Sequence, residues 1–136
     1  MGRHELDPRE YGSRYYRTRT LSDPTVLAER IIADLPPAGT NGIPRGVEFS
    51  IHVMGGVLLQ VHVGGLTDNF TFAHRRTCRY SIEADDLVAW LTRTVETYNW
   101  TNPDDPTDRR FFSSVYLLTE SDYHSAFWAA GVVRVI

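Results

Sequence analysis

VEFSIHVMGGVLLQVHV, residues 47–63, is the stretch that says most about the structure of this chain. Apolar and polar residues alternate on both sides of two glycines, which is the period of a half-buried β-strand. The stretch therefore predicts a hairpin with one apolar face. A three-residue loop from Met54 to Gly56 keeps that face together, whereas a two-residue loop sets core residues against polar ones. The expected cross-strand pairs are Val53 with Val57, Ile51 with Leu59 and Phe49 with Val61.

Helix signals lie on both sides of this hairpin. Residues 22–35 carry an apolar stripe with helical spacing, and two prolines follow it, which end a helix. Residues 81–98 carry a second apolar stripe. The shorter elements that we expect are strands at 69–72, 111–119 and 132–136 and a helix at 121–130.

These elements predict an α+β domain, in which helices pack on one face of a mainly antiparallel sheet, in the order α-β-β-(β)-α-β-α-β. The strand at 111–119 has aromatic residues on both faces, which indicates a central position in the sheet. Residues 99–110 are predicted to form a polar loop. Residues 1–20 form an arm rich in Arg and Tyr, and residues 21–136 form a single domain, because no linker divides them.

The bulk composition is typical of a soluble globular domain. The chain has 136 residues, of which 42% are hydrophobic and 23% charged, and this length buries a sufficient core without disulfides. A single cysteine, Cys78, fits a reducing compartment. Neither a signal sequence nor a membrane-spanning apolar run is found in the sequence. We therefore expect a cytoplasmic protein without a membrane partner.

The five histidines do not predict a metal site. In the expected register His62 lies opposite Glu48 and His52 lies opposite Leu58, so the two histidines are about 13 Å apart along the sheet. That distance is too long for one ion, because histidine ligands lie about 2 Å from a metal. The acidic loop at 102–108 lacks the glycine and the glutamate of a calcium loop. We expect neither a metal nor another cofactor.

Catalytic motifs are missing from the sequence. It contains no nucleophile elbow, no phosphate-binding loop and no dinucleotide-binding glycine pattern. Cys78 has only His74 near it along the chain, which does not establish a nucleophile and its base. We therefore expect no catalytic residues and no small-molecule substrate. A small enzyme of unknown reaction is the third hypothesis, and it predicts a deep pocket lined by His52, His62 or Glu48.

Several short runs carry a family resemblance: LAERI at 27–31, IPRGVEFS at 43–50, the glycine pair after it, and YN at 98–99 with Asp108 and FF at 111–112. They resemble small actinobacterial and phage proteins that carry one of the large polyvalent protein-associated domains. The resemblance covers about residues 25–65 and 95–118, and it departs from the family pattern at Arg109-Arg110, where a tyrosine would follow the aspartate. It implies an accessory protein of a phage or mobile element and carries over no catalytic residues.

The leading hypothesis is a non-catalytic protein-interaction module that binds a host protein or a second copy of itself. Tyr, Trp and Arg are the residues enriched at the centres of protein interfaces. Trp100 falls in the expected polar loop, which offers little core to bury it, and Phe112, Tyr116 and Phe127 also lie in segments that look exposed. The predicted contact residues are Trp100, Arg109, Arg110, Tyr123 and Trp128.

The alternative is a nucleic-acid-binding accessory protein. All fourteen basic residues are arginines, and arginine beside tyrosine can bind phosphate and stack on bases. The competing interpretation is an arm that packs on its own chain. Residues 1–81 carry ten Arg against eight acidic residues, whereas residues 82–136 carry four against nine, so the two parts complement each other. The residues of the nucleic-acid hypothesis are Arg14, Arg17, Arg19, Arg75, Arg76 and Arg79.

Overall fold

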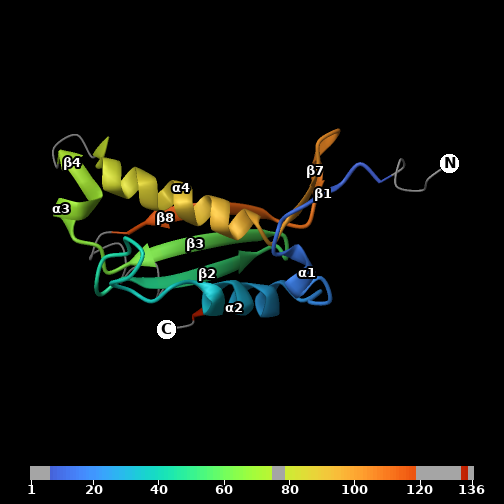
Figure 1. Cartoon of the computed structure of the whole chain (residues 1–136), viewed down its shortest axis with the longest axis horizontal. Helices are drawn as coiled ribbons and strands as arrows, with labels where there is room; N and C mark the ends of the chain where they lie inside the picture. The colour runs from blue at the N-terminus through green and yellow to red at the C-terminus, as the bar shows by residue number, and fades with distance from the viewer. Residues whose placement is uncertain (1–6, 75–78, 119–132, 135–136) are drawn as a thin grey trace.

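The computed structural model describes residues 7–74, 79–118 and 133–134 (Figure 1). The helices in these residues are α1 (Tyr15–Thr18), α2 (Pro24–Asp34), α3 (Asp68–Thr71) and α4 (Ile82–Glu96). The strands are β1 (Glu10–Tyr11), β2 (Glu48–Met54), β3 (Leu58–Gly64), β4 (Phe72–His74), β5 (Arg79–Tyr80), β6 (Trp100–Asn102), β7 (Asp105–Arg109), β8 (Phe112–Leu117) and β9 (Val133–Arg134).

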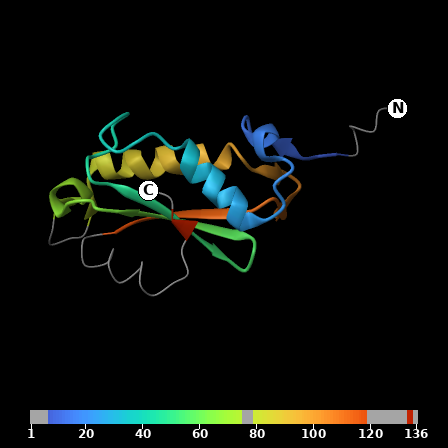
Figure 2. The same ribbon diagram turned by 90° about the horizontal axis from the view of Figure 1, so that it is seen from below.

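A four-stranded sheet forms the centre of the fold, in the strand order β8-β3-β2-β9. Strand β2 runs antiparallel to β3 and to β9, and β8 runs parallel to β3. Helices α2 and α4 pack on the same face of this sheet (Figure 2). The expected α+β fold with helices on one face is confirmed, and one of the three strand pairings is parallel.

The two long helices begin where their capping residues predict. The Asp23 side chain caps α2, and Pro24 takes the first helical position. Leu35 is already extended, because a proline follows it. Ser81 caps α4 in the same way as Asp23 caps α2. Among the described residues, no helix is both long enough and apolar enough to cross a membrane.

The β2–β3 hairpin differs from its predicted register by two residues. Its loop has three residues, as expected, but they are 55–57 and not 54–56. Gly55 and Gly56 both take positive φ angles, +60° and +74°, and the loop encloses both of them. A shift of two residues keeps the same side chains on the apolar face, so the face was predicted correctly and the pairs were wrong. The observed pairs are Val53–Leu59, Ile51–Val61 and Phe49–Val63.

Two segments take a different secondary structure from the expected one. Residues 99–110 form the strands β6 and β7 instead of a loop, and they join β1 in a small three-stranded sheet. The expected strand at 69–72 begins as helix α3, because the Thr67 hydroxyl accepts the Phe70 amide and starts a helical turn. The strand follows as β4, which pairs with β5.

The strand expected at 111–119 is confirmed as β8, but its expected central position is wrong. It lies at the edge of the four-stranded sheet, and its far side pairs with no strand in the part of the chain that the structure describes. Aromatic residues on both faces did not indicate a central strand, because the outward ones remain exposed. The helix expected at 121–130 lies outside the described residues, and β9 lies within the expected closing strand.

Candidate functional site

The four-stranded sheet has one face that points away from α2 and α4, and we call it the outer face. Side chains alternate between the two faces along a strand, so the neighbours of the buried residues Ile51 and Val61 point outward. The cross-strand register aligns these neighbours in rows across β2, β3 and β8. The rows are Met54–Leu58–Phe112, His52–Gln60–Ser114 and Ser50–His62–Tyr116.

His52 and His62 stack on each other in the middle of the outer face. Their ring centroids are 3.8 Å apart, with 26° between the ring planes. The separation expected from the sequence is wrong, because the register places His52 opposite Gln60 and His62 opposite Ser50. Distance therefore gives no reason to exclude a shared ligand. Within the described ranges, however, no group of three or more His, Cys, Asp or Glu residues is close enough to hold a metal ion.

Four buried polar atoms of the outer face have no hydrogen-bond partner among the described residues. A buried polar atom without a partner costs about 1–3 kcal/mol, so most atoms of this kind in native proteins are paired. The four atoms lie in adjacent rows and have almost no accessible area, so they form a covered polar centre of this face. The atoms are Ser50 Oγ, His52 Nε2, His62 Nδ1 and Ser114 Oγ.

The centre of the outer face is uncharged at pH 7, although the register also pairs Ser50 with Arg134 of β9 and Gly64 with Glu48. His52 and His62 are only 5% and 8% exposed, and this desolvation lowers the pKa of both rings. Burial, with the neighbouring His52, lowers the pKa of His62 to about 4. The ring of Tyr116 packs edge-on against His62, with centroids 5.5 Å apart. None of the nine residues in the three rows carries a charge at neutral pH.

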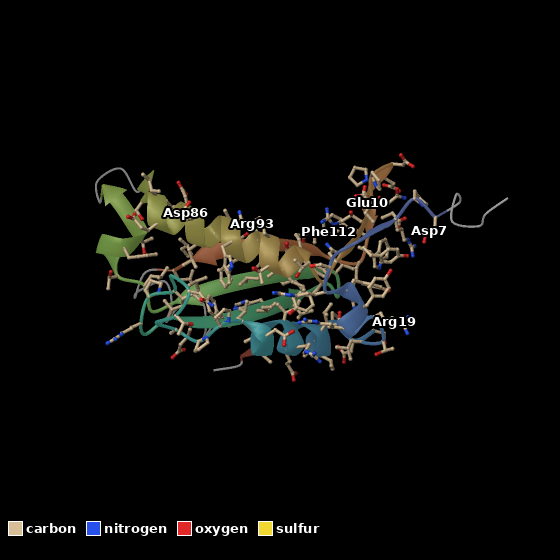
Figure 3. The ribbon with its side chains drawn as sticks, viewed as in Figure 1. Asp7, Glu10, Arg19, Asp86, Arg93 and Phe112 are labelled. Atoms are coloured by element: carbon tan, nitrogen blue, oxygen red, sulfur yellow. The ribbon has the colours of Figure 1, made fainter. Side chains whose placement is uncertain are left out.

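Exposed apolar side chains border this neutral centre. Met54, Phe112 and Tyr116 are 47%, 39% and 45% exposed, and Val57 in the neighbouring loop is also exposed. Figure 3 shows Phe112 between the end of α4 and the region of β1 and β7. Large apolar side chains that stay exposed on one face of a protein are typical of an interaction site.

Strand β8 has a free edge beside the outer face. The amides of Phe112 and Leu118 donate to the carbonyls of Val57 and Val63, at 2.7 and 3.0 Å. Even-numbered residues of β8 thus bond toward β3. Successive residues of a strand point their backbone groups to opposite sides, so the odd-numbered residues point theirs away from β3. No other strand of the described residues pairs with that side.

Trp100 lies in strand β6 and not in a loop, which corrects the sequence-based interpretation. It pairs with Tyr11 of β1 across the small sheet. The guanidinium carbon of Arg9 lies 3.8 Å from the centroid of the Trp100 ring, and Arg9 also forms an ion pair with Asp108 at 3.7 Å. Trp100 is therefore half-buried under the arm and is not part of the outer face.

Arg109 contacts its own chain on two sides. Its Nη2 atom donates to Glu96 Oε1 at 2.7 Å, and its guanidinium lies 5.1 Å from the ring of Phe112. Arg109 thus joins the end of α4 to the first residue of β8. Two further predicted contact residues, Tyr123 and Trp128, lie outside the described residues.

Arg110 braces the arm against the domain. It donates to the backbone carbonyls of Thr18, Leu21 and Tyr98, at 2.6, 3.1 and 2.8 Å. Burial lowers the pKa of its guanidinium, which still remains charged at neutral pH. Arg110 is therefore engaged within the chain, and the structure does not bring it together with Trp100 in one exposed patch.

The described part of the arm packs on its own domain. The amides of Gly12 and Arg14 donate to the carbonyls of Asn99 and Thr97, at 2.8 and 2.9 Å. A Cβ atom on Gly12 would lie 2.3 Å from the carbonyl oxygen of Thr97, so only glycine allows this close approach. These contacts continue the pairing of β1 with β6.

Three tyrosines of the arm form a cluster beside two exposed arginines. The ring centroids of Tyr11, Tyr15 and Tyr16 lie 4.8 to 6.1 Å apart. Tyr16 is 64% exposed, and Arg17 and Arg19 are exposed next to it. Figure 3 shows Arg19 at the α1 end of the arm, apart from the acidic side chains near β1.

The other arginines of the nucleic-acid hypothesis are not brought into that cluster by the described residues. Arg14 lies over the ring of Tyr98, at 5.9 Å from its centroid. Arg75 and Arg76 lie outside the described residues, and only the backbone of Arg79 is described, in β5. The structure therefore groups only Arg17 and Arg19 with exposed aromatic residues.

Two shallow grooves lie away from the outer face. One, of about 340 Å³, lies between the end of α2 and the start of β2, and Glu48 is the single titratable residue in its lining. Neither His52 nor His62 lines it, so this groove does not pair an acid with a base for proton transfer. The other, of about 380 Å³, lies along α4, where Asp86 and Arg93 contribute to its lining (Figure 3).

Ser50 and Ser114 belong to the outer face but were not singled out from the sequence. Strand alternation places both on the polar side of their strands, which is the only signal that they carry. That signal also describes a solvated serine. Their burial comes from the packing around them, and the sequence pattern does not report it.

Comparisons with protein-family models, curated proteins and solved structures found no match to this chain. The resemblance to the large polyvalent protein-associated domains therefore stays a prediction from short motifs.

Proposed function

We propose that this chain is a non-catalytic protein-interaction module, which binds another protein chain through the outer face and the adjoining edge of β8. One observation carries the proposal: the exposed side chains of Met54, Phe112 and Tyr116 gather on one face, beside an edge of β8 that pairs with no described strand. Exposed apolar side chains beside an unpaired strand edge offer a partner chain both apolar contact area and backbone hydrogen bonds, as in strand addition to a sheet edge.

The chemistry of this surface favours a protein over the other classes of partner. Nucleic acid is recognised mainly through its phosphates, which require cations, and the nine residues of the three rows include none, while the single arginine in register with them is Arg134 of β9, opposite Ser50. Small ligands occupy concave sites, whereas the rows follow an extended sheet. A partner chain supplies apolar area for the exposed side chains and backbone donors and acceptors for the edge of β8.

The proposal extends the expectations drawn from the sequence. The family resemblance indicates a phage or mobile-element accessory protein that acts in the cytoplasm of its host. Its partner is then a host protein or a second copy of the chain. The contact residues differ from those proposed from the sequence, because Phe112 and Tyr116 take the place of Trp100, Arg109 and Arg110.

The test is capture of partners by the tagged full chain from an actinobacterial lysate, with and without nuclease. We expect a stoichiometric protein that survives nuclease and is lost at least about tenfold with the double variant Phe112→Ala/Tyr116→Ala. Ile82→Ala, at an exposed apolar residue of α4, is the matched control and leaves capture unchanged. Equal capture by both variants would place the interface elsewhere.

Nucleic-acid binding by the arm is a second candidate, and the exposed Tyr16 beside Arg17 and Arg19 favours it. It predicts that a labelled single-stranded oligonucleotide binds the chain at about 50 mM salt and is released at about 200 mM, since phosphate contacts release counterions. The triple variant Tyr16→Ala/Arg17→Ala/Arg19→Ala removes this binding. Fluorescence anisotropy that stays flat at low salt ends this candidate.

A further inference from the structure

We infer that β8 pairs antiparallel with β8 of a second copy of the chain, about a twofold axis through Ser114, so that two sheets join into one. The inference rests on the proposed function, because it names the partner of the same surface. Its first support is the edge itself. Strand β8 has the sequence FSSVYL, six residues without a charge, a proline or a glycine.

The other edges of the described sheets carry the features that prevent such pairing. Strand β7 contains Asp105, Pro106 and Asp108, and β1 is two residues long. Charges, prolines and short length are the usual protection of exposed strand edges. Strand β8 has none of them, which indicates that its edge is used and not protected.

Symmetry restricts the possible registers of two paired β8 strands. A twofold axis perpendicular to the sheet makes the strands antiparallel and keeps both outer faces on one side. Residues directly opposite each other in an antiparallel pair have side chains on the same face. The axis must therefore set one residue of β8 opposite the same residue of the second copy. The choice within β8 is between an axis at Ser114 and one at Val115.

The axis at Ser114 pairs the exposed aromatic residues of β8. It sets Phe112 opposite Tyr116 of the second copy, twice, and these are the exposed aromatic residues of β8. An axis at Val115 sets Ser114 opposite Tyr116 instead and leaves Phe112 beyond the end of the paired strand.

The backbone agrees with this register. The odd-numbered residues of β8 point their amides and carbonyls outward, so Ser113 bonds to Val115 of the second copy, and the ladder with β3 stays intact. Ser114 then forms a pair without mutual backbone hydrogen bonds, where the Cα atoms are closest, at about 4.5 Å. That distance lies in the range that a disulfide spans.

Cross-linking at the axis tests the inference. Cys78 is the only cysteine, so the variant Cys78→Ser/Ser114→Cys carries one thiol per chain. With oxidised glutathione we expect most of it to form a disulfide-linked dimer on a non-reducing gel. Cys78→Ser/Gln60→Cys is the control, on the outer face but one strand inward, and it stays monomeric. Equal cross-linking of the two variants, or of neither, overturns the inference.

A mixture of two variants tests the register. Cys78→Ser/Phe112→Cys with Cys78→Ser/Tyr116→Cys should form the mixed dimer, while each alone forms little. Preferential linking of Tyr116→Cys to Ser114→Cys overturns the axis at Ser114.

The wild-type chain gives an independent readout, since a cysteine variant can fail to fold. Analytical ultracentrifugation should find twice the monomer mass of 15.5 kDa. A monomer at every concentration overturns the inference. If that monomer still captures a foreign protein in a manner sensitive to Phe112→Ala/Tyr116→Ala, the proposed function stands while the second copy is excluded as the partner.

Discussion

The junction between arm and domain and the outer face of the sheet treat buried polar atoms in opposite ways. At the junction Arg110 donates to Thr18, Leu21 and Tyr98, and the Asn99 side chain exchanges hydrogen bonds with the backbone of Phe111. On the outer face, four buried polar atoms have no partner among the described residues. The junction is complete within one chain, so it serves stability. On the outer face the described residues leave such atoms unpaired, and we interpret the exposed apolar side chains around them as a surface for a second chain.

The largest expected effect on stability comes from removing Arg110 from the junction between arm and domain. Arg110→Ala leaves three carbonyls without their charged donor and should lower the free energy of unfolding by about 3–4 kcal/mol. Arg110→Lys keeps the charge but not the planar fork, so its loss should be smaller. Urea unfolding followed by tryptophan fluorescence measures both. A loss below about 1 kcal/mol for Arg110→Ala would contradict the role of the junction.

The next effect concerns the stacked histidines and depends on pH. Burial lowers the pKa of His62 from 6.5 to about 4, so the unfolded chain binds more protons between these values. The contribution of neutral His62 to the free energy of unfolding is therefore fully present above about pH 6.5. It falls by at most about 3 kcal/mol as the pH drops toward 4. His62→Phe should flatten that part of the profile. Urea unfolding of the wild-type protein and of the His62→Phe variant across this pH range measures the contribution of His62, because the two proteins have the same carboxylates.

Two serine-to-alanine substitutions should change the free energy of unfolding in opposite directions, because one hydroxyl is hydrogen-bonded and the other is buried and unpaired within the part of the chain that the structure describes. The Ser81 hydroxyl caps α4 by accepting the Ala84 amide, so Ser81→Ala should cost about 1–2 kcal/mol. The buried Ser50 hydroxyl has no partner among the described residues, so Ser50→Ala should stabilise the isolated chain by up to about 1 kcal/mol. Thermal unfolding compares them. A clear loss with Ser50→Ala would mean that this hydroxyl is satisfied.

The smallest effect should come from the surface of the arm. Arg9 lies over Trp100 and pairs with Asp108 while it remains largely exposed. Exposed pairs and cation–π contacts of this kind contribute about 0.5–1 kcal/mol each at most. Arg9→Ala should therefore cost about 1 kcal/mol or less and shift the emission of Trp100, with Arg45→Ala as an exposed control. A loss as large as that of Arg110→Ala would show that the arm depends on its surface contacts.

The elements whose residues interact locally were predictable from the sequence. The caps at Asp23 and Ser81 and the apolar stripes of α2 and α4 act within one or two helical turns, and both helices were confirmed. The alternation in β2 and β3 also gave the correct apolar face, because a strand has a side-chain period of two.

The predictions that were wrong concern arrangements that are equivalent locally and differ only in their contacts with the rest of the chain. Loops at 54–56 and 55–57 have the same length and keep the same face, but only the observed one brings His52 and His62 into contact. The Asp and Pro residues of β7 are typical of a loop, yet they also occur on an edge strand. The position of β8 at the edge depends on which strands pair with it, which its own six residues do not encode.

The distance along the chain between Arg110 and its partners has a consequence for synthesis on the ribosome. Thr18 and Arg110 are 92 residues apart. At about 5–20 residues per second, the arm leaves the ribosome roughly 5–20 seconds before its brace is made. During that interval the tyrosines and arginines of the arm have no docking place in their own chain. The arm is made before the domain that holds it and is among the last segments to dock.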